Sequence, residues 1–271
     1  MSLPEPTPDE LLGRRLYGEA LDDAAIAEWF ADEENGYVGI AGAADDGPMS
    51  GTGAANARHL FRHLPARRYT RCLALGAANG REYARLADRI DRVIAIEPGR
   101  RFWRNEIAGI PAEYRMPTLR GAIDLPDGSC DLAGCFGVLH HIPNVGEVLG
   151  ELARVLAPGA PLMIREPISS LGDFRRPRPG LTRCERGIPH RLIDEMLARV
   201  GFRTARKRFV RFQPLHRLWW AIGVAQPWEH PALVRLDAAI SWASAWNARY
   251  WRSNLPNKLA PAMAYWLAYR D

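Results

Sequence analysis

The chain has 271 residues, of which 47% are hydrophobic and 25% charged. It therefore holds enough apolar material for a large core and too much for a disordered chain. The net charge is +5, but the basic residues are scattered, whereas a nucleic-acid binder usually concentrates them on one recognition element, so we expect no nucleic-acid partner.

The four cysteines show no C-x-x-C or Cys/His ligand spacing, so we expect neither a disulfide framework nor a metal site. The first ten residues, MSLPEPTPDE, lack the basic and apolar segments of a secretory leader. No uninterrupted apolar run approaches the ~18 residues of a membrane span. These features predict a cytoplasmic protein.

Residues 1–66 are expected to form an N-terminal helical cap. Apolar residues recur at helical spacing around Leu12 and again around Trp29. A glycine-rich loop over residues 36–53 is expected to interrupt these helices.

Residues 67–212 alternate short apolar runs with helical patterns, which is typical of a parallel sheet with crossover helices. The expected strands are 71–76, 92–97, 116–122, 130–136, 160–166 and 202–209, and the expected helices are 80–90, 100–107, 146–156 and 190–200.

The last part of the chain, residues 213–271, holds seven of the nine tryptophans. Residues 213–260 are expected to form a Trp-rich helical insertion or lid, with a helix over 232–251. Residues 261–271 are expected to close the sheet as a final strand. The indole rings either pack the helix onto the sheet or line an organic substrate.

A turn of small residues, GAANG (76–80), follows the first expected strand and precedes a helical pattern. Small side chains allow a ligand to approach the backbone and the start of the helix. The G-x-G-x-x-G pattern of nicotinamide sites is broken at Ala78 and Arg81, and the phosphate-loop pattern G-x-x-x-x-G-K-S/T is absent. The turn predicts a nucleotide-type cofactor site.

An acidic residue, Glu97, ends the second expected strand, 21 residues after Gly76. A carboxylate at this position of a Rossmann-like sheet can accept both ribose hydroxyls of an adenosine. Glu97 and the turn together therefore favour an adenosine-containing cofactor.

Four segments in this order resemble the class I S-adenosylmethionine-dependent methyltransferases, particularly the small-molecule branch called methyltransferase type 11: LALGAANG (73–80), VIAIEP (93–98), LPDGSCDLAGCFGVLHHIPN (125–144) and ELARVLAPGAPLMIREP (151–167). The resemblance covers roughly residues 71–167. It implies an α/β fold with a Rossmann-like sheet of seven strands, mostly parallel with an antiparallel last strand. It also implies S-adenosyl-L-methionine as cofactor and S-adenosyl-L-homocysteine as product.

The resemblance also implies cofactor-binding residues. The glycine turn would surround the methionine part of the cofactor, Glu97 would hold its ribose, and Ile123 would touch its adenine. The full set of expected cofactor contacts is Gly76, Ala77, Ala78, Gly80, Glu97, Pro98, Ala122, Ile123, Asp124, Phe136 and Gly137.

The chain departs from the family pattern in the turn and near the adenine site. Ala74 stands where the family commonly has an acid, Ala78 stands where its middle glycine falls, and Gly121 stands where an acid is expected two residues before Ile123. Adenine recognition would then fall to Asp124 or to the backbone. Three residues of the N-terminal cap could replace the missing acceptor for the cofactor's ammonium group: Glu33, Glu34 and Tyr37.

Two adjacent histidines, His140 and His141, follow the fourth expected strand, and Glu166 ends the fifth. A histidine beside a carboxylate is a reasonable general base for an alcohol. We therefore expect catalysis to involve His140, His141 and Glu166. The competing interpretation is that one imidazole only fixes the loop and that Glu166 only caps the following turn.

The loop over residues 172–187 is dense in arginine. Its side chains could clamp a phosphate or carboxylate, which would make the substrate anionic, or the loop could simply be solvated. The candidate clamp residues are Arg175, Arg176, Arg178 and Arg183.

The expected function is methyl transfer to a small-molecule acceptor, and the expected acceptor atom is a hydroxyl oxygen of a sugar or natural-product-like metabolite. Two alternatives stay open: a catalytically inactive protein that only binds the cofactor or its product, and a methyltransferase acting on RNA or protein. For an RNA substrate, the chain lacks the N/D-P-P-Y/F signature of base methylation. The sequence leaves the oligomeric state open.

Overall fold

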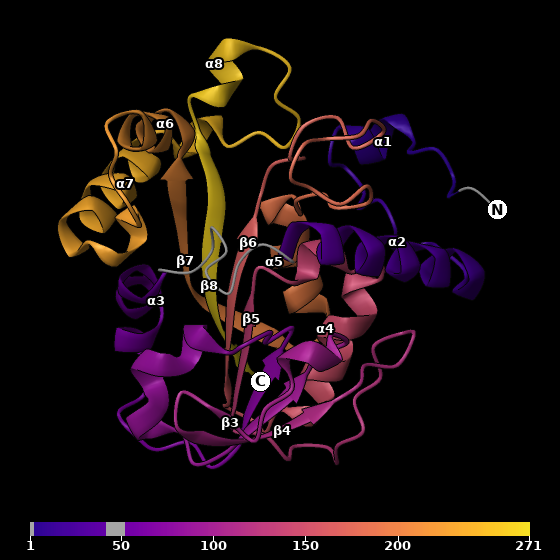
Figure 1. Cartoon of the computed structure of the whole chain (residues 1–271), viewed down its shortest axis with the longest axis vertical. Coiled ribbons are helices and arrows are strands. Elements are labelled where there is room, and N and C mark those ends of the chain that lie inside the picture. The colour runs from indigo at the N-terminus through magenta and orange to yellow at the C-terminus, as the bar shows by residue number, and fades with distance from the viewer. Residues whose placement is uncertain (1–2, 42–51) are drawn as a thin grey trace.

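The computed structural model describes residues 3–41 and 52–271, with only the backbone over 35–41. A single eight-stranded sheet runs through the molecule in the order β3-β4-β2-β1-β5-β6-β8-β7 (Figure 1). The strands are β1 (Cys72–Leu75), β2 (Val93–Ile96), β3 (Glu106–Ile107), β4 (Ile110–Arg115), β5 (Leu132–Phe136), β6 (Pro161–Pro167), β7 (Phe202–Phe212) and β8 (Pro261–Arg270).

The helices flank this sheet and cover its edges. The α-helices are α1 (Pro8–Leu11), α2 (Asp23–Ala41), α3 (Gly53–His59), α4 (Val145–Val155), α5 (His190–Arg199), α6 (Gln213–Ala221), α7 (Pro231–Ala243) and α8 (Leu255–Lys258). Short 3₁₀ segments are η1 (Phe61–His63), η2 (Arg81–Arg89), η3 (Arg100–Phe102), η4 (Leu139–His141), η5 (Pro227–Glu229) and η6 (Ala245–Asn247).

The sheet is parallel from β4 through β6, while β8 runs antiparallel to both β6 and β7. This confirms the predicted Rossmann-like sheet with an antiparallel last strand and a helical insertion, α6 to α8, before it. The two-residue β3, which forms a hairpin with β4, is added to the seven expected strands. The strand order reverses at β1, so the carboxyl ends of β1 and β5 border the crevice where such sheets bind ligands.

The sheet is apolar on both faces because every residue of β1 and β2 is buried. On one face, Leu73 belongs to an apolar cluster with residues of α4 and α5. On the other, Cys72 and Ala74 belong to a cluster with residues of α3 and η2. Figure 1 shows these helices on opposite sides of the sheet.

The expected strand over 116–122 is wrong, because the strand beside β2 is Ile110–Arg115. Proline at 117 lacks a backbone donor, and the chain turns at Gly121, whose N–H donates to the carbonyl of Thr118. The pairing strand instead carries Ile110 and Tyr114 into the core.

Three helix predictions also need correction. Residues 100–107 form only η3 and β3, because Ala108 and Gly109 have positive φ and close the β3-β4 hairpin. Residues 80–90 form the 3₁₀ segment η2, and the helix expected over 232–251 ends at Ala243. Within the expected loop over 36–53, the helix α2 continues to Ala41 and residues 42–51 lie outside the described residues.

The seven tryptophans of the C-terminal part differ in burial, and two of them, Trp228 and Trp251, are half-buried. Trp219 and Trp266 are buried, and Trp266 lies in the sheet core. Trp220, Trp242 and Trp246 are exposed, so these three rings do not pack the insertion onto the sheet. Within residues 3–41 and 52–271, no helix combines the length and apolar character that crossing a membrane requires.

Candidate active site

The glycine turn leaves the end of β1 in a left-handed conformation. Gly76, Ala78 and Gly80 have φ values of 57°, 44° and 69°. A Cβ atom on Gly76 would lie 2.1 Å from Cγ2 of Val138, and one on Gly80 would lie 2.3 Å from Cγ2 of Ile107. Glycine is therefore required at both positions, whereas Ala78 keeps its methyl group in a conformation that favours glycine.

Both backbone polar groups of Ala78 form hydrogen bonds with side chains. Its N–H donates to Oε2 of Glu97 at 2.8 Å, and its carbonyl accepts from the hydroxyl of Tyr114 at 2.8 Å. The turn after β1 is thus tied to the ends of β2 and β4. Tyr114 was not among the expected site residues.

Glu97 is a buried carboxylate whose oxygens can accept further hydrogen bonds. Burial raises its pKa, while the N–H groups of Gly99 and Ala78 oppose that rise. Each oxygen accepts one backbone N–H, and a carboxylate oxygen can accept two hydrogen bonds. Two acceptor positions therefore remain, the number that two ribose hydroxyls would need. The adjacent Pro98 is exposed.

The residues expected around the adenine differ in their surroundings. Ile123 packs in the same apolar cluster as Leu75 and Ile96, the last residues of β1 and β2. Its backbone N–H donates to Oε2 of Glu151 at 2.8 Å. Ala122 and Asp124 are exposed, which leaves Ile123 as the member of this loop that lies beside the strand ends.

Phe136 and Gly137 lie where β5 ends, beside β1 in the sheet. The Phe136 ring meets Tyr83 edge to face at 5.4 Å between centroids. The N–H of Gly137 donates to the carbonyl of Arg165. Ala77, next in the turn, is buried against the core.

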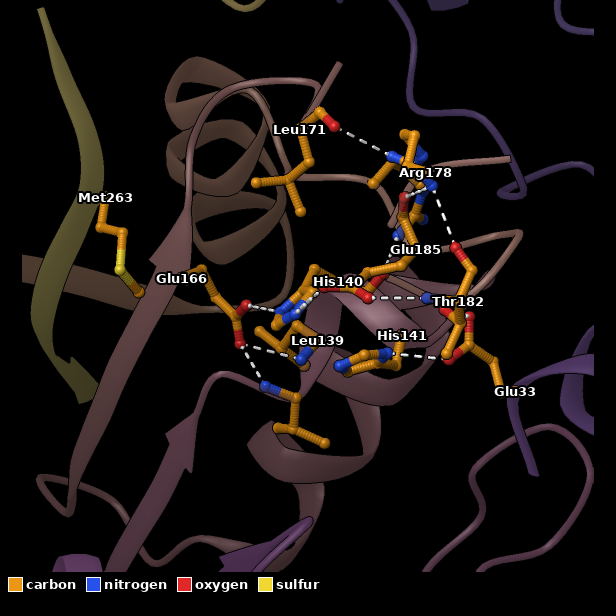
Figure 2. A network of polar contacts seen from close by, with 12 residues as sticks. Glu33, Leu139, His140, His141, Glu166, Leu171, Arg178, Thr182, Glu185 and Met263 are labelled. Atoms are coloured by element: carbon orange, nitrogen blue, oxygen red, sulfur yellow. Dashed lines mark hydrogen bonds and ion pairs between the residues drawn. The ribbon is translucent and has the colours of Figure 1, made fainter. Parts of the chain in front are cut away.

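Glu166 of β6 fixes the start of η4 (Figure 2). Its Oε1 accepts the N–H groups of Val138 and Leu139 at 2.9 and 2.8 Å, and its Oε2 lies 2.6 Å from Nδ1 of His140. The carboxylate is fully buried. Because β5 and β6 are neighbours, Glu166 meets His140, one of the two histidines expected beside it, whereas His141 has another partner.

His140 lies between two carboxylates. Its Nε2 is 3.4 Å from Oε1 of Glu185, on the side opposite Glu166. Burial alone would lower the pKa of His140, but Glu166 and Glu185 outweigh burial and raise the pKa to about 9. In the absence of another cation, the two carboxylates therefore favour the protonated ring.

His141 has its own carboxylate partner from the N-terminal cap. Its Nδ1 lies 2.8 Å from Oε2 of Glu33 in α2, whose Oε1 accepts from the hydroxyl of Thr182 at 2.7 Å. The two histidine rings are 4.1 Å apart between centroids. The side chain of His141 is 24% exposed against 9% for His140, so His141 is the more accessible of the two.

A buried arginine, Arg186, holds the backbone beneath both histidines. Its guanidinium donates to the carbonyls of His140 and Ile142 at 3.0 Å and to that of Tyr17 at 2.9 Å. It also lies over the ring of Trp29, 5.0 Å from the centroid. The loop that carries it passes against the end of β6, where a Cβ on Gly187 would lie 1.8 Å from the carbonyl oxygen of Ser169.

Glu185 and Arg186 were missed because their loop was interpreted as an anion clamp. Three of the four proposed clamp residues have partners within the protein: Arg175 and Arg176 pair with Asp173, and Arg178 donates to carbonyls of its own loop. Arg176 and Arg183 are exposed. The one local signal was Gly187, which follows two charged residues and marks a close backbone approach.

The three residues expected to replace the missing acid of the glycine turn lie in different surroundings. Glu33 binds His141, Glu34 is exposed, and the side chain of Tyr37 lies outside the described residues. Ala74 is fully buried within β1.

Comparisons with known proteins agree with this fold. Residues 73–164 match a family model described as a methyltransferase domain. The chain is similar to the solved structure of the cyclase SpnF, with a TM-score of 0.57 and 15% identity over 94% of this chain and 98% of that one. At this identity the likeness shows a shared fold.

Two further structures share the fold. An S-adenosylmethionine-dependent methyltransferase from Thermotoga maritima has a TM-score of 0.50 and 15% identity, covering 91% of this chain and 99% of that one. A chain of the complex that contains the Haloferax volcanii Trm112 methyltransferase activator has a TM-score of 0.52 and 12% identity, covering 92% and 96%.

Proposed function

We propose that this chain, whose residues 73–164 match a methyltransferase domain, uses S-adenosyl-L-methionine as cofactor to methylate a hydroxyl oxygen of a small molecule. The observation that carries this proposal is the His141–Glu33 pair beside the strand end where β5 meets β1. When bound, the cofactor supplies an activated methyl group on a sulfonium, which needs alignment with its acceptor.

Glu97 and the glycine turn would bind the cofactor. The two remaining acceptor positions of Glu97 suit the ribose hydroxyls, and Ile123 offers an apolar surface beside them. The backbone of the turn would face the amino acid end, with Phe136 and Gly137 next to it.

His141 would be the general base. A histidine that donates its Nδ1 hydrogen to a carboxylate is fixed in the tautomer whose Nε2 can take a proton from a hydroxyl. Glu33 provides that carboxylate at 2.8 Å. His140 has a carboxylate facing each of its nitrogens, so we assign His140 and Glu166 to positioning the loop.

The acceptor would be neutral, such as a sugar or natural-product-like alcohol. Three buried carboxylates, Glu33, Glu166 and Glu185, surround the histidine pair. Two of the arginines that could clamp an anion, Arg175 and Arg178, already have partners within the protein. This disfavours the phosphate or carboxylate substrate that the arginine-rich loop suggested.

The test is release of S-adenosylhomocysteine with a panel of neutral alcohols, sugars and phenols. We expect His141→Gln to lower turnover by about 100- to 10,000-fold, the range for loss of a general base. Cofactor affinity measured by calorimetry should stay unchanged. His230→Gln, at an exposed histidine, is the matched control. Equal turnover by His141→Gln and the unaltered protein would rule out this base.

A second candidate is cofactor binding without methyl transfer. Ala78 occupies a left-handed position where the turn favours glycine, and SpnF shows that a protein of this fold can be a cyclase. This candidate predicts that the protein binds S-adenosylmethionine yet releases no S-adenosylhomocysteine with any acceptor of the panel.

A further inference from the structure

Three side chains from two separate segments converge beside the proposed base. The histidines His140 and His141 and the carboxylate of Glu185 each offer a ligand atom, and these atoms lie within 4.8 Å of one another. Nε2 of His140 is 3.4 Å from Oε1 of Glu185. Two ligand atoms of a tetrahedral zinc site with bonds of about 2.1 Å lie roughly 3.4 Å apart, so this pair already has the spacing of metal ligands.

Both histidines are oriented as metal ligands usually are. A metal-binding histidine commonly donates its other ring N–H to a carboxylate, which fixes the ring and leaves one nitrogen for the ion. Nδ1 of His140 lies 2.6 Å from Glu166, and Nδ1 of His141 lies 2.8 Å from Glu33. The Nε2 atoms are then the ligand atoms of these two rings, and an ion would displace the proton that the carboxylates favour on His140.

The orienting carboxylates are themselves anchored. Glu166 accepts two backbone N–H groups, and Glu33 accepts from the hydroxyl of Thr182. Figure 2 shows Glu166 on one side of the histidine pair and Glu33 on the other, with Glu185 above them. The arrangement therefore holds both rings without help from a ligand.

The charge of the cluster also favours a cation. Glu33, Glu166 and Glu185 are all buried. In the part of the chain that the structure describes, their direct salt-bridge partners are the two histidines, while the guanidinium groups of Arg178 and Arg186 act on them only from a greater distance. Buried carboxylates are costly unless a cation compensates them, and a divalent ion would do so.

We propose that His140, His141 and Glu185 form a binding site for one divalent transition-metal ion of the zinc type. Two imidazoles and one carboxylate suit zinc and leave the fourth position open. The sequence predicted no metal site, because these ligands have no short-range spacing. The inference goes beyond the proposed function, since it concerns the binding of the ion whether or not the chain transfers methyl groups.

The ion and the proposed base compete for one atom. Bound zinc would take the Nε2 lone pair that His141 needs to accept a proton from a hydroxyl. If both proposals hold, Zn²⁺ should inhibit methyl transfer at concentrations that saturate the site.

The direct test is calorimetric titration of chelator-treated, desalted protein with ZnCl₂. We expect one Zn²⁺ per chain and a higher melting temperature for the zinc-loaded protein. Glu185→Gln and His141→Gln should each abolish this stoichiometric binding. Glu33→Gln, which alters only an orienting carboxylate, should weaken it by about 10- to 100-fold. His230→Gln should bind Zn²⁺ as the unaltered protein does.

The variants avoid the most buried ligand, His140, and circular dichroism checks that each one folds. Should a variant unfold, the melting temperature of the unaltered protein with and without Zn²⁺ still decides whether the folded state binds the ion. Absence of stoichiometric binding, or binding that Glu185→Gln and His141→Gln leave intact, would overturn the proposal. The zinc titration and the methyl-transfer assay are independent measurements. A negative result in one therefore does not decide the outcome of the other.

Discussion

The backbone N–H of Ala78 donates a hydrogen bond of 2.8 Å to Oε2 of Glu97. This bond joins the turn after β1 to the end of β2, and it forms at a non-glycine residue whose φ is 44°. The end of the sheet where we propose that the cofactor binds therefore contains both the proposed ribose acceptor and a strained residue.

We expect Ala78→Gly to stabilise the protein by about 1 kcal/mol. A left-handed backbone conformation costs an L-residue roughly 1–2 kcal/mol, and glycine removes this cost. The greater freedom of glycine in the unfolded chain offsets about 0.5–1 kcal/mol of that stabilisation. Urea unfolding measures the difference. The neighbouring Ala77→Gly, where φ is not positive, should instead destabilise the protein. A loss of stability in Ala78→Gly would show that the turn is unstrained.

Glu97→Ala should weaken binding of S-adenosylmethionine by about 10- to 100-fold, because a hydrogen bond to a charged group contributes roughly 1.5–3 kcal/mol. Calorimetry with the unaltered protein and the variant gives the ratio. The control is Glu113→Ala, which removes an exposed carboxylate from β4. Equal affinities for Glu97→Ala and the control would place the ribose elsewhere.

Cofactor affinity should also depend on pH through Glu97. Burial raises the pKa of Glu97 above its ordinary value of 4.5, and the ionised carboxylate is the form that accepts the ribose hydroxyls. Affinity should therefore be full above the raised pKa and fall as the pH drops through it, starting at a higher pH than an exposed glutamate would give. A pH series of cofactor titrations checks this. In Glu97→Ala the same decline should be absent.

Arg186→Met should destabilise the protein by roughly 3 kcal/mol or more, because the buried carbonyls of Tyr17, His140 and Ile142 would lose their donor. Denaturant unfolding measures this loss. Arg183→Met, three residues earlier and exposed, should change stability little. If the two variants unfold alike, Arg186 does not support the histidine segment.

Much of the fold could be predicted from local patterns. The buried runs of β1 and β2 indicated a parallel sheet, because strands covered on both faces are apolar throughout. The bond between Ala78 and Glu97 links two strand ends only 19 residues apart. The strand Ile110–Arg115 was missed for two reasons. It forms a hairpin with an edge strand of only two residues, and its exposed residues Pro111 and Glu113 interrupt the apolar pattern.

The sequence by itself determined the sheet, the glycine turn, the position of Glu97 at a strand end and the placement of Glu166 beside the histidines, because each follows from strand order and residue spacing. Only the tertiary structure decided what surrounds the histidines. Glu33 lies 108 residues before His141, and Arg186 lies 46 residues after His140. Such contacts depend on how the cap and the 172–187 loop pack over the sheet edge, and no local periodicity encodes that packing.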